Sequence, residues 1–507
     1  MATTKAPRKK KEQIKRPDLK IGIKDFGPIA EGEIELKPLT VFIGPNNSGK
    51  SYAAMLIYSI FRAFIPESKD MPFLYLSPDS EENMVLMRYL SELKAIVDDM
   101  NIGDERQIPN ELLLKIVNEM RKSIYERKLG NEISDFFSCK LDKLVALGKE
   151  KFSLNIGTSS YKDEIIYYHE GKLVVDDLQQ TLPSNDIRVR LNYSTNSLLD
   201  KKSKVRVISF IADGRIMFHI PLDDKITEFE LGYIAAGISV KMPQYFLTLC
   251  YYLPSARSGM IQLYRTIMGG IIEQYKSFAM NPFAMDRQAK SSEFAGVALR
   301  FVSSIISLPK EKGYFYQFAE KMEEELIKGN ISAKFDVLPD IKYKFQDTEI
   351  QLQRASTSVT EIAPLILYLK YIIQPGSVLI IEEPEAHLHP ANIRILAKYL
   401  VRLVNKGVNV LITTHSDYLL EQINNLYLLS KIDPEERVVK FHYEKDDYLN
   451  RDELGVYEFH YDEEAKGYKI KQAEIDEDGI LEREIYSITE DLYEETSQLQ
   501  RESSDEE

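Results

Sequence analysis

The chain has 507 residues, of which 44% are hydrophobic and 28% charged, values that exclude a fully disordered protein and allow a sizeable core. It carries only two cysteines, Cys139 and Cys250, and no run of about 18 consecutive apolar residues, so we expect neither a disulfide scaffold nor a membrane span and favour the cytoplasm. The net charge of −14 argues against a surface shaped throughout for nucleic acid, although a local basic path is compatible with it.

The two ends of the chain carry opposite charge. Residues 1–18 are rich in lysine and arginine without apolar periodicity, which predicts a disordered basic arm, either simply solvated or touching phosphate backbones. The arm lacks the apolar stretch of a secretory signal, so we do not expect export. Residues 498–507 are acidic and of low complexity, which predicts a disordered tail.

The next segment alternates as short strands and then changes to helical spacing. We expect strands at 19–23, 32–36 and 39–43, the last a continuous apolar run typical of a buried strand. Residues 51–64 are apolar at helical spacing and stop before a proline, which predicts a helix. Residues 19–65 are therefore expected to form the first part of an α/β domain.

Residues 66–330 are expected to be an insertion with its own core, because a segment of this length cannot be a loop. Its pattern predicts helices over 80–150, strands over 151–222 and further helices over 228–328, with an interruption at Leu253-Pro254.

The domain is expected to resume over 331–430. Strand-like runs at 334–337 and 341–345 precede a βαβ unit made of 378–381, a helix over 390–405 and 408–413. Residues 431–497 are expected to form a small C-terminal α/β region, with strands at 439–443 and 456–461 and a helix ending near Leu499.

A complete phosphate-binding motif, G-x-x-x-x-G-K-[ST], lies between the strand at 39–43 and the helix at 51–64. Glycines let backbone N–H groups surround phosphates, and the helix N-terminus adds positive potential. Lys50 would reach the β- and γ-phosphate oxygens, and the Ser51 hydroxyl would ligate Mg²⁺. The predicted ATP-binding loop is Gly44, Pro45, Asn46, Asn47, Ser48, Gly49, Lys50 and Ser51.

Acidic partners follow the buried run at 378–381. Glu382 would hold Mg²⁺ through water, and Glu383 would orient and deprotonate the attacking water. The alternative is a charged turn without a role. His415 ends the next predicted strand, 32 residues after Glu383, a spacing that covers one helix and one strand and places the two side by side. We expect His415 to hydrogen-bond the γ-phosphate or the attacking water.

Ser358, followed three residues later by Glu361, matches a capping box that opens a helix over 362–373, with Pro364 in its first turn. A helix start with free N–H groups and hydroxyls suits a phosphate. The phosphates of the chain's own nucleotide are already bound by the loop 44–51. Ser356 and Ser358 are therefore expected to face a nucleotide bound on another subunit. The alternative is a plain helix cap.

Arg257 lies after an apolar run in the segment 253–259. Three interpretations stay open: contact with a phosphate, pairing with a carboxylate of the 382–383 region, or a structural salt bridge.

Taken in order, these motifs resemble the ABC-type ATPase head of the RecF, SMC and OLD group. Within that group the match is to AAA-type ATPases of phage-defence operons, including the OLD, Gabija, Septu and PARIS systems. The matching segments are 44–51, 356–361, 380–390 and 413–416, together with 23–29 and 252–259, the last expected to return to the head.

The resemblance implies a P-loop ABC-type head with a mixed, mainly parallel core sheet, split by a large helical and β insertion. It makes Lys50 and Ser51 the Walker A pair, Glu382 and Glu383 the Walker B pair, and His415 the switch histidine. Ser356 and Ser358 become the counterpart of the signature, and 385–390 the D-loop. Two heads would then sandwich two ATP molecules. The serine segment lacks the glycines of LSGGQ, and Glu382 stands where aspartate is usual.

The chain therefore reads as an ATPase using ATP and Mg²⁺, acting as a homo-oligomer whose nucleotide state controls a separate nuclease or toxin in phage defence. No Toprim pattern follows residue 430, and Asp476-Glu477-Asp478 precedes a glycine as in a turn. The alternative is a RecF/SMC-like DNA-binding ATPase in DNA repair. A transporter subunit is disfavoured by the 332 residues between Lys50 and Glu382.

Overall fold

The computed structural model describes residues 16, 19–64, 83–158, 161–175, 187–195, 204–212, 215–222, 248–264, 296–335, 339–477, 479–481 and 493–500. The chain divides into two compact units: the first comprises Met1–Pro17, Gly32–Ala54 and Leu249–Glu507, and the second Asp18–Glu31 and Met55–Thr248. The first unit thus includes residues 249–330, which we expected in the insertion except for 252–259, expected in the head. The basic arm lies outside the described residues except for Arg16, and the acidic tail except for 498–500, which end a helix over 493–500.

A parallel sheet forms the centre of the first unit. Its strands run in the order β11 (Cys250–Leu253), β15 (Val378–Glu382), β16 (Asn409–Thr413), β3 (Leu39–Ile43) and β17 (Leu454–Asp462), each parallel to its neighbour. β18 (Gly467–Gln472) is antiparallel to β17, and β2 (Ile29–Glu35) follows it. Every residue of β3, β15 and β16 is buried, as their apolar composition requires. This confirms the α/β class with a mixed, mainly parallel core sheet.

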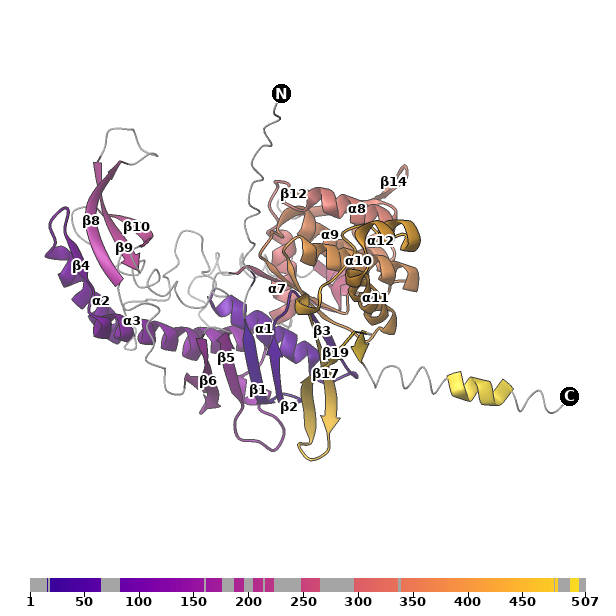
Figure 1. Cartoon of the computed structure of the whole chain (residues 1–507), viewed down its shortest axis with the longest axis horizontal. Coiled ribbons are helices and arrows are strands. Elements are labelled where there is room, and N and C mark those ends of the chain that lie inside the picture. The colour runs from indigo at the N-terminus through magenta and orange to yellow at the C-terminus, as the bar shows by residue number, and fades with distance from the viewer. Residues whose placement is uncertain are drawn as a thin grey trace, which may run out of the picture. The chain divides into compact units, whose positions relative to one another are not determined.

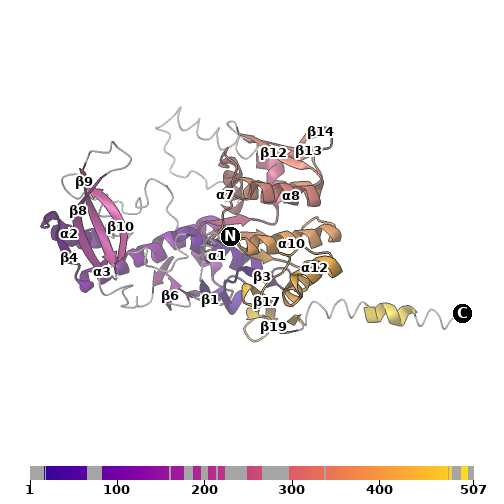
Figure 2. The same ribbon diagram turned by 45° about the horizontal axis from the view of Figure 1, so that its top comes forward.

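Helices accompany this sheet in the first unit. They are α7 (Gly296–Ile306), α8 (Tyr316–Ile327), α9 (Thr357–Tyr371), α10 (Pro390–Asn405), α11 (Asp417–Leu428) and α12 (Pro434–Phe441). The helix α1 (Lys50–Phe64) begins in the first unit, and its residues from Met55 belong to the second. Figure 1 shows α8, α10 and α11 packed together, and Figure 2 shows the antiparallel strands β12 (Asn330–Phe335), β13 (Pro339–Phe345) and β14 (Thr348–Gln351) next to α8. Across the part of the chain that the structure describes, no helix has the length and apolar character needed to cross a membrane.

The second unit contains a run of four antiparallel strands, a separate four-stranded antiparallel sheet and a helical segment. The run, which follows β2 in the strand order of the large sheet, is β1 (Lys20–Phe26), β5 (Ser153–Thr158), β6 (Tyr161–His169) and β7 (Lys172–Val175). The separate sheet is β4 (Glu105–Gln107), β8 (Ile187–Thr195), β9 (Lys204–Ala212) and β10 (Arg215–Leu222). The helices are α2 (Asn83–Asp98), α3 (Asn110–Lys122), a π-helix (Ser123–Leu129) and α4 (Gly130–Phe137). Figure 1 shows β8, β9 and β10 beside α2 and α3. The predicted change from helices to strands near residue 150 is confirmed.

Two local predictions are wrong. The strand expected at 439–443 is largely the helix α12, because the Asp433 side chain accepts a hydrogen bond from Glu435 N and Pro434 occupies the first helical position. Cys250–Leu253, expected within helical sequence, is the edge strand β11. By contrast, the turn expected at Asp476 is confirmed, because Asp476 N donates to Gly479 O between β19 (Glu474–Ile475) and β20 (Ile480–Leu481).

The start of α9 also differs from the prediction. The helix begins at Thr357 with Ser356 as its N-cap residue, five residues earlier than expected, so Pro364 lies in its interior. The capping box of Ser358 and Glu361 is wrong, because Glu361 pairs with Arg257 instead. Residues Val359 to Lys370 of α9 are all buried, and this packing outweighs the backbone hydrogen bond that the proline cannot make.

A buried ion pair fixes the other end of α9. Lys370 Nζ lies 2.8 Å and 2.9 Å from the two carboxylate oxygens of Glu323 on α8 and donates to Ile331 O at 2.7 Å. Ile331 N in turn donates to Glu323. Both side chains are almost fully buried, and burial raises the pKa of Glu323, opposed by its hydrogen bond with Lys370.

We predict that Lys370→Met lowers the unfolding free energy by about 3–5 kcal/mol, because it leaves a buried carboxylate without its cation. The double variant Lys370→Met/Glu323→Gln should recover most of that loss, since the glutamine is neutral and still accepts from Ile331 N. Denaturant unfolding of both variants measures the difference. Equal destabilisation of the single and double variants would contradict a stabilising role for the Lys370–Glu323 ion pair.

Candidate active site

The site forms where three buried parallel strands end. Glu382, the last residue of β15, is paired in register with Thr413 of β16, and Thr413 is paired with Phe42 of β3. The segments that follow these strands therefore meet at one edge of the sheet. The structure thus brings together the Walker A loop, the two glutamates and the histidine segment.

The loop after β3 has the backbone shape of a phosphate cradle. Gly44 and Gly49 have φ of 135° and 100°, and Asn47 has φ of 62°. A Cβ on Gly44 would lie 2.5 Å from Phe459 O of β17, so only glycine fits there. Pro45, Asn46, Asn47 and Ser51 are exposed, whereas Ser48, Gly49 and Lys50 are buried. The exposed stretch leaves the outer face of the loop accessible to a ligand.

Lys50 folds back over this loop. Its Nζ donates to Gly44 O and Pro45 O, both at 2.8 Å. Burial lowers the pKa of Lys50 to about 8, while the charges of Glu383 and Glu385 oppose that shift. The ammonium is thus partly desolvated and held by neutral carbonyls, an arrangement that an anionic phosphate would stabilise.

Glu382 is positioned to serve a cation. Its side chain is buried; Oε2 accepts from Ser255 N at 3.0 Å, and Oε1 has no hydrogen-bond partner. An unpartnered buried carboxylate oxygen and the exposed Ser51 hydroxyl fit a Mg²⁺ ion that keeps several waters and binds phosphate oxygens. Over the described ranges no group of three or more His, Cys, Asp or Glu could hold a metal, so a metal here would depend on nucleotide oxygens.

Glu383 follows the last residue of β15, and its backbone is in the left-handed conformation. Its φ is 43°, and its N–H donates to Thr413 O at 2.9 Å. Its carboxylate is 42% exposed, and Oε1 lies 3.7 Å from His415 Nε2. The predicted neighbourhood of Glu383 and His415 is therefore present, and the carboxylate is accessible to water.

His415 is held by a residue outside the predicted catalytic set, Glu385. The Glu385 carboxylate accepts from the Thr414 hydroxyl and from His415 N, the latter at 3.2 Å. Burial raises the pKa of Glu385. Burial and the charge of Lys50 lower the pKa of His415, so its imidazole is neutral around neutral pH. The acidic run after 378–381 was the sequence signal for Glu385, but its role depends on the fold.

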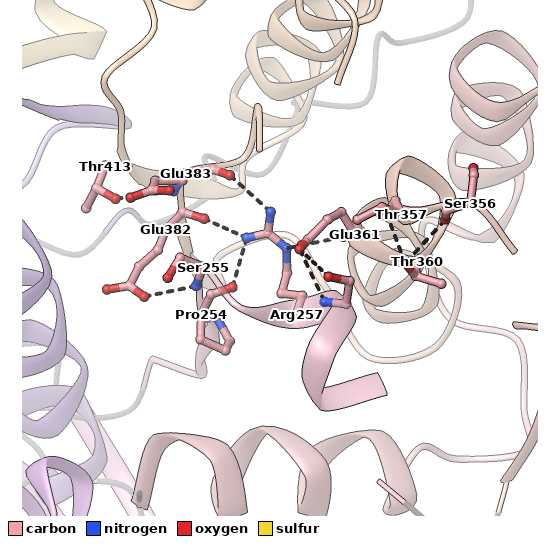
Figure 3. A network of polar contacts seen from close by, with 11 residues as sticks. Pro254, Ser255, Arg257, Ser356, Thr357, Thr360, Glu361, Glu382, Glu383 and Thr413 are labelled. Carbon is pink, nitrogen blue, oxygen red and sulfur yellow. Dashed lines mark hydrogen bonds and ion pairs between the residues drawn. The ribbon is translucent and has the colours of Figure 1, made fainter. Parts of the chain in front are cut away.

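Arg257 is a second residue missing from the predicted set. Its guanidinium is 1% exposed and lies behind the end of β15, where it donates to the carbonyls of Glu382 and Glu383 (Figure 3). Its Nε also lies 3.0 Å from Glu361 Oε2. Of the three interpretations, phosphate contact is excluded by burial within this unit, and the carboxylate partner is Glu361 rather than Glu382 or Glu383.

Ser356 and Ser358 lie apart from this cluster. Ser356 Oγ is 3.1 Å from Ser358 Oγ at the start of α9, and Ser356 is exposed. In Figure 3 Ser356 and Glu382 lie on opposite sides of Arg257. The structure therefore does not bring these serines to the chain's own Walker residues.

The strand–loop–helix of the Walker A segment, next to strands that end in glutamates and a histidine, defines a P-loop ATPase fold. The sequence matches the model of the AAA ATPase domain over residues 19–257 and 264–420. This match covers more than half of the chain, and the chain belongs to the AAA ATPase domain family.

Solved structures with a similar fold include heads of SMC proteins. The chain is similar to an Smc head bound to the C-winged helix domain of ScpA, at 12% identity and TM-score 0.34, covering 91% of this chain and 98% of that one. It is also similar to an Smc head with an extended coiled coil bound to the C-terminal domain of ScpA from Pyrococcus furiosus, at 10% identity and TM-score 0.35, covering 90% of this chain and 96% of that one. A third is the SMC head domain from Thermotoga maritima, at 12% identity and TM-score 0.30, covering 91% of this chain and 100% of that one. No curated protein matches the sequence.

The lowered pKa of Lys50 predicts a pH dependence of nucleotide affinity. The cationic form predominates below a pH of about 8 and is lost above it, so ATP affinity should fall as the pH rises from 7.5 to 9.5, by up to about tenfold per pH unit beyond 8. Equilibrium binding of a fluorescent ATP analogue without Mg²⁺ measures this, because the phosphates are fully ionised over that range. Lys50→Arg stays charged, so a residual affinity that does not change with pH is expected. An unchanged wild-type affinity up to pH 9.5 would refute the contribution of the Lys50 charge to ATP binding.

Proposed function

We propose that the chain binds ATP with Mg²⁺ and hydrolyses it to ADP and phosphate. The observation that carries this proposal is the convergence of Lys50, Glu383 and His415 at the common edge of β3, β15 and β16, with Glu383 accessible and 3.7 Å from His415. A buried cation, a buried acid with a free acceptor atom and an accessible base are the components that phosphoryl transfer to water requires.

In the proposed reaction Glu383 accepts a proton from the attacking water, whose oxygen forms the new bond to the γ-phosphorus. The bond from that phosphorus to the β–γ bridging oxygen breaks, and ADP leaves with the electron pair. Lys50 stabilises charge on the β- and γ-phosphate oxygens, and neutral His415 orients the water or the γ-phosphate. Ser51 and Glu382 would hold Mg²⁺, which neutralises phosphate charge when bound.

We propose that two copies of the chain share the nucleotide. Ser356 and Ser358 present hydroxyls at the start of a 15-residue helix, where backbone N–H groups lack intrahelical partners. Ser356 is exposed, and the two serines contact each other, not the chain's own Walker loop. These features support engagement of an ATP bound to the other copy.

For the biological role, we propose that this nucleotide-dependent association controls a separate effector, a nuclease or toxin, in phage defence. The support is the resemblance of the segments 252–259 and 380–390 to phage-defence ATPases. A DNA-binding ATPase of RecF/SMC type is the competing role. ATP-dependent binding of duplex DNA that weakens steeply with salt would favour it over effector control.

We predict that Lys50→Ala abolishes ATP binding and that Glu383→Gln retains it. Glu383→Gln should lower turnover by about 10²–10⁴-fold, because the amide preserves the shape but cannot accept the proton. Phosphate release and equilibrium ATP binding, measured on both variants, separate the two effects. Wild-type turnover in Glu383→Gln would refute the general base.

A second prediction concerns the serines. Specific activity should rise with protein concentration in the wild type, and Ser356→Ala/Ser358→Ala should lower it while ATP binding to the isolated chain stays unchanged. Mixing this double variant with Lys50→Ala should restore part of the activity, because each chain then supplies the half-site the other lacks. Inactive mixtures together with concentration-independent wild-type activity would refute the shared site.

A further inference from the structure

Arg257 lies between the start of α9 and the end of β15 and contacts both. Its guanidinium is almost completely buried, and four of its partners are main-chain carbonyls: Pro254, Glu361, Glu382 and Glu383, at 2.9, 3.2, 2.6 and 3.0 Å. The fifth partner is the carboxylate of Glu361. Most of the donor capacity is thus directed at backbone rather than at a second charge, and the contacts with Glu382 and Glu383 are to their carbonyls.

At one end Arg257 contacts the main chain of the two Walker B glutamates. Glu383 adopts a left-handed backbone conformation, which is strained for a non-glycine residue and persists only where its surroundings hold it. Its N–H is held by Thr413 O and its C=O by Arg257. Glu382 is held in the same way, its C=O by Arg257 and its carboxylate by Ser255 N, two residues before Arg257 in the chain.

At the other end Arg257 is tied to the first turns of α9. Glu361 Oε2 lies 3.0 Å from Arg257 Nε, and Glu361 Oε1 accepts from both Ser258 N and Ser258 Oγ. One residue earlier, Thr360 N donates to Ser356 O at 3.0 Å, and the Thr360 hydroxyl contacts the carbonyls of Ser356 and Thr357. Figure 3 shows this chain of contacts from Glu382 through Arg257 and Glu361 to Ser356.

We propose that Arg257 is a positioning residue that couples the start of α9 to the Walker B glutamates, so that engagement of Ser356 and Ser358 by a phosphate sets the direction of Glu382 and Glu383. This inference rests on the proposed function. The link transmits displacement because its central members, Arg257, Glu361 and Glu382, are buried in a low dielectric, where separating them leaves a donor or carboxylate unpaired. A planar fork that meets several carbonyls at once is available to arginine and not to lysine.

The experiment compares Arg257→Lys and Arg257→Gln with the matched control Arg402→Gln. Arg402 belongs to the same unit and is buried at its pair with Asp447, to which it donates at 2.6 and 3.0 Å, but it has no contact with the Walker segments in the described structure. Both Arg257 variants should turn over ATP about 10²-fold more slowly than wild type, because a displacement of about 1 Å costs that much. Arg402→Gln should lower the melting temperature without lowering turnover at a temperature where it is folded.

A binding readout accompanies turnover. ATP affinity without Mg²⁺ depends on the Walker A loop and should stay unchanged in Arg257→Lys. The gain in affinity on adding Mg²⁺ depends on Glu382 and should shrink several-fold. An Arg257→Lys protein with wild-type turnover and a wild-type Mg²⁺ gain would overturn the inference, as would a loss that Arg402→Gln reproduces. If the wild type binds but does not hydrolyse ATP, the proposed function fails. The gain in ATP affinity on adding Mg²⁺, compared between the wild type and Arg257→Lys, then still tests the role of Arg257.

The coupling itself is tested with milder variants on the α9 side. Ser258→Ala and Glu361→Gln should lower turnover in the wild-type background by a few-fold to tenfold. In the Ser356→Ala/Ser358→Ala background, the same substitutions should have little further effect, because nothing then engages α9. Equal effects in both backgrounds would show that Glu361 and Arg257 act independently of the serines and would overturn the coupling.

Discussion

The site depends on the parallel register of β3, β15 and β16. These strands are buried along their whole length, so a shift of β15 by one residue would draw the Glu383 carboxylate into the buried stretch or remove Val378 from it. Because the register is thereby fixed, the first residues beyond each strand arrive at the same edge. The residues proposed for catalysis lie there, and their relative positions follow from packing within the sheet.

The charged groups of the site are stabilised mainly by backbone. Lys50 is held by the carbonyls of Gly44 and Pro45, Arg257 by carbonyls at the end of β15, and Glu382 by the N–H of Ser255. Glu383 contributes its main-chain carbonyl, which accepts from Arg257. The arrangement leaves a lysine charge and a carboxylate oxygen poised for ligands that carry the opposite charge, and it needs little reorganisation when they bind.

Much of this could be predicted from sequence, because the information was local. The Walker A loop is a contiguous motif between a strand and a helix, and the glutamates and His415 each follow a run of buried apolar residues. Adjacent parallel strands then imply that they meet. The α/β class followed from the same pattern.

What could not be predicted depends on partners distant in the chain. Arg257 and Glu361 are 104 residues apart, and no local pattern links them, so Glu361 looked like a helix cap. The strand β17 read as part of a separate C-terminal region, yet Val456 and Tyr457 pair with Val41 and Phe42. Val439 and the residues after it suggested a strand, but Val439 is exposed on α12, where the Asp433 cap and Pro434 determine the structure.

The position of β3 has a consequence for how the protein is made. Both of its neighbours, β16 and β17, are encoded near the other end of the chain, beginning at Asn409 and Leu454. A ribosome adding about 5–20 residues per second needs on the order of 20–70 s to pass from β3 to β16. Throughout that interval the apolar strand Leu39–Ile43 lacks both hydrogen-bonded partners that it has in the finished sheet. Nascent chains must therefore keep this strand from aggregating, and a message truncated before residue 409 yields a protein in which the strand before the 44–51 loop has neither of its partners.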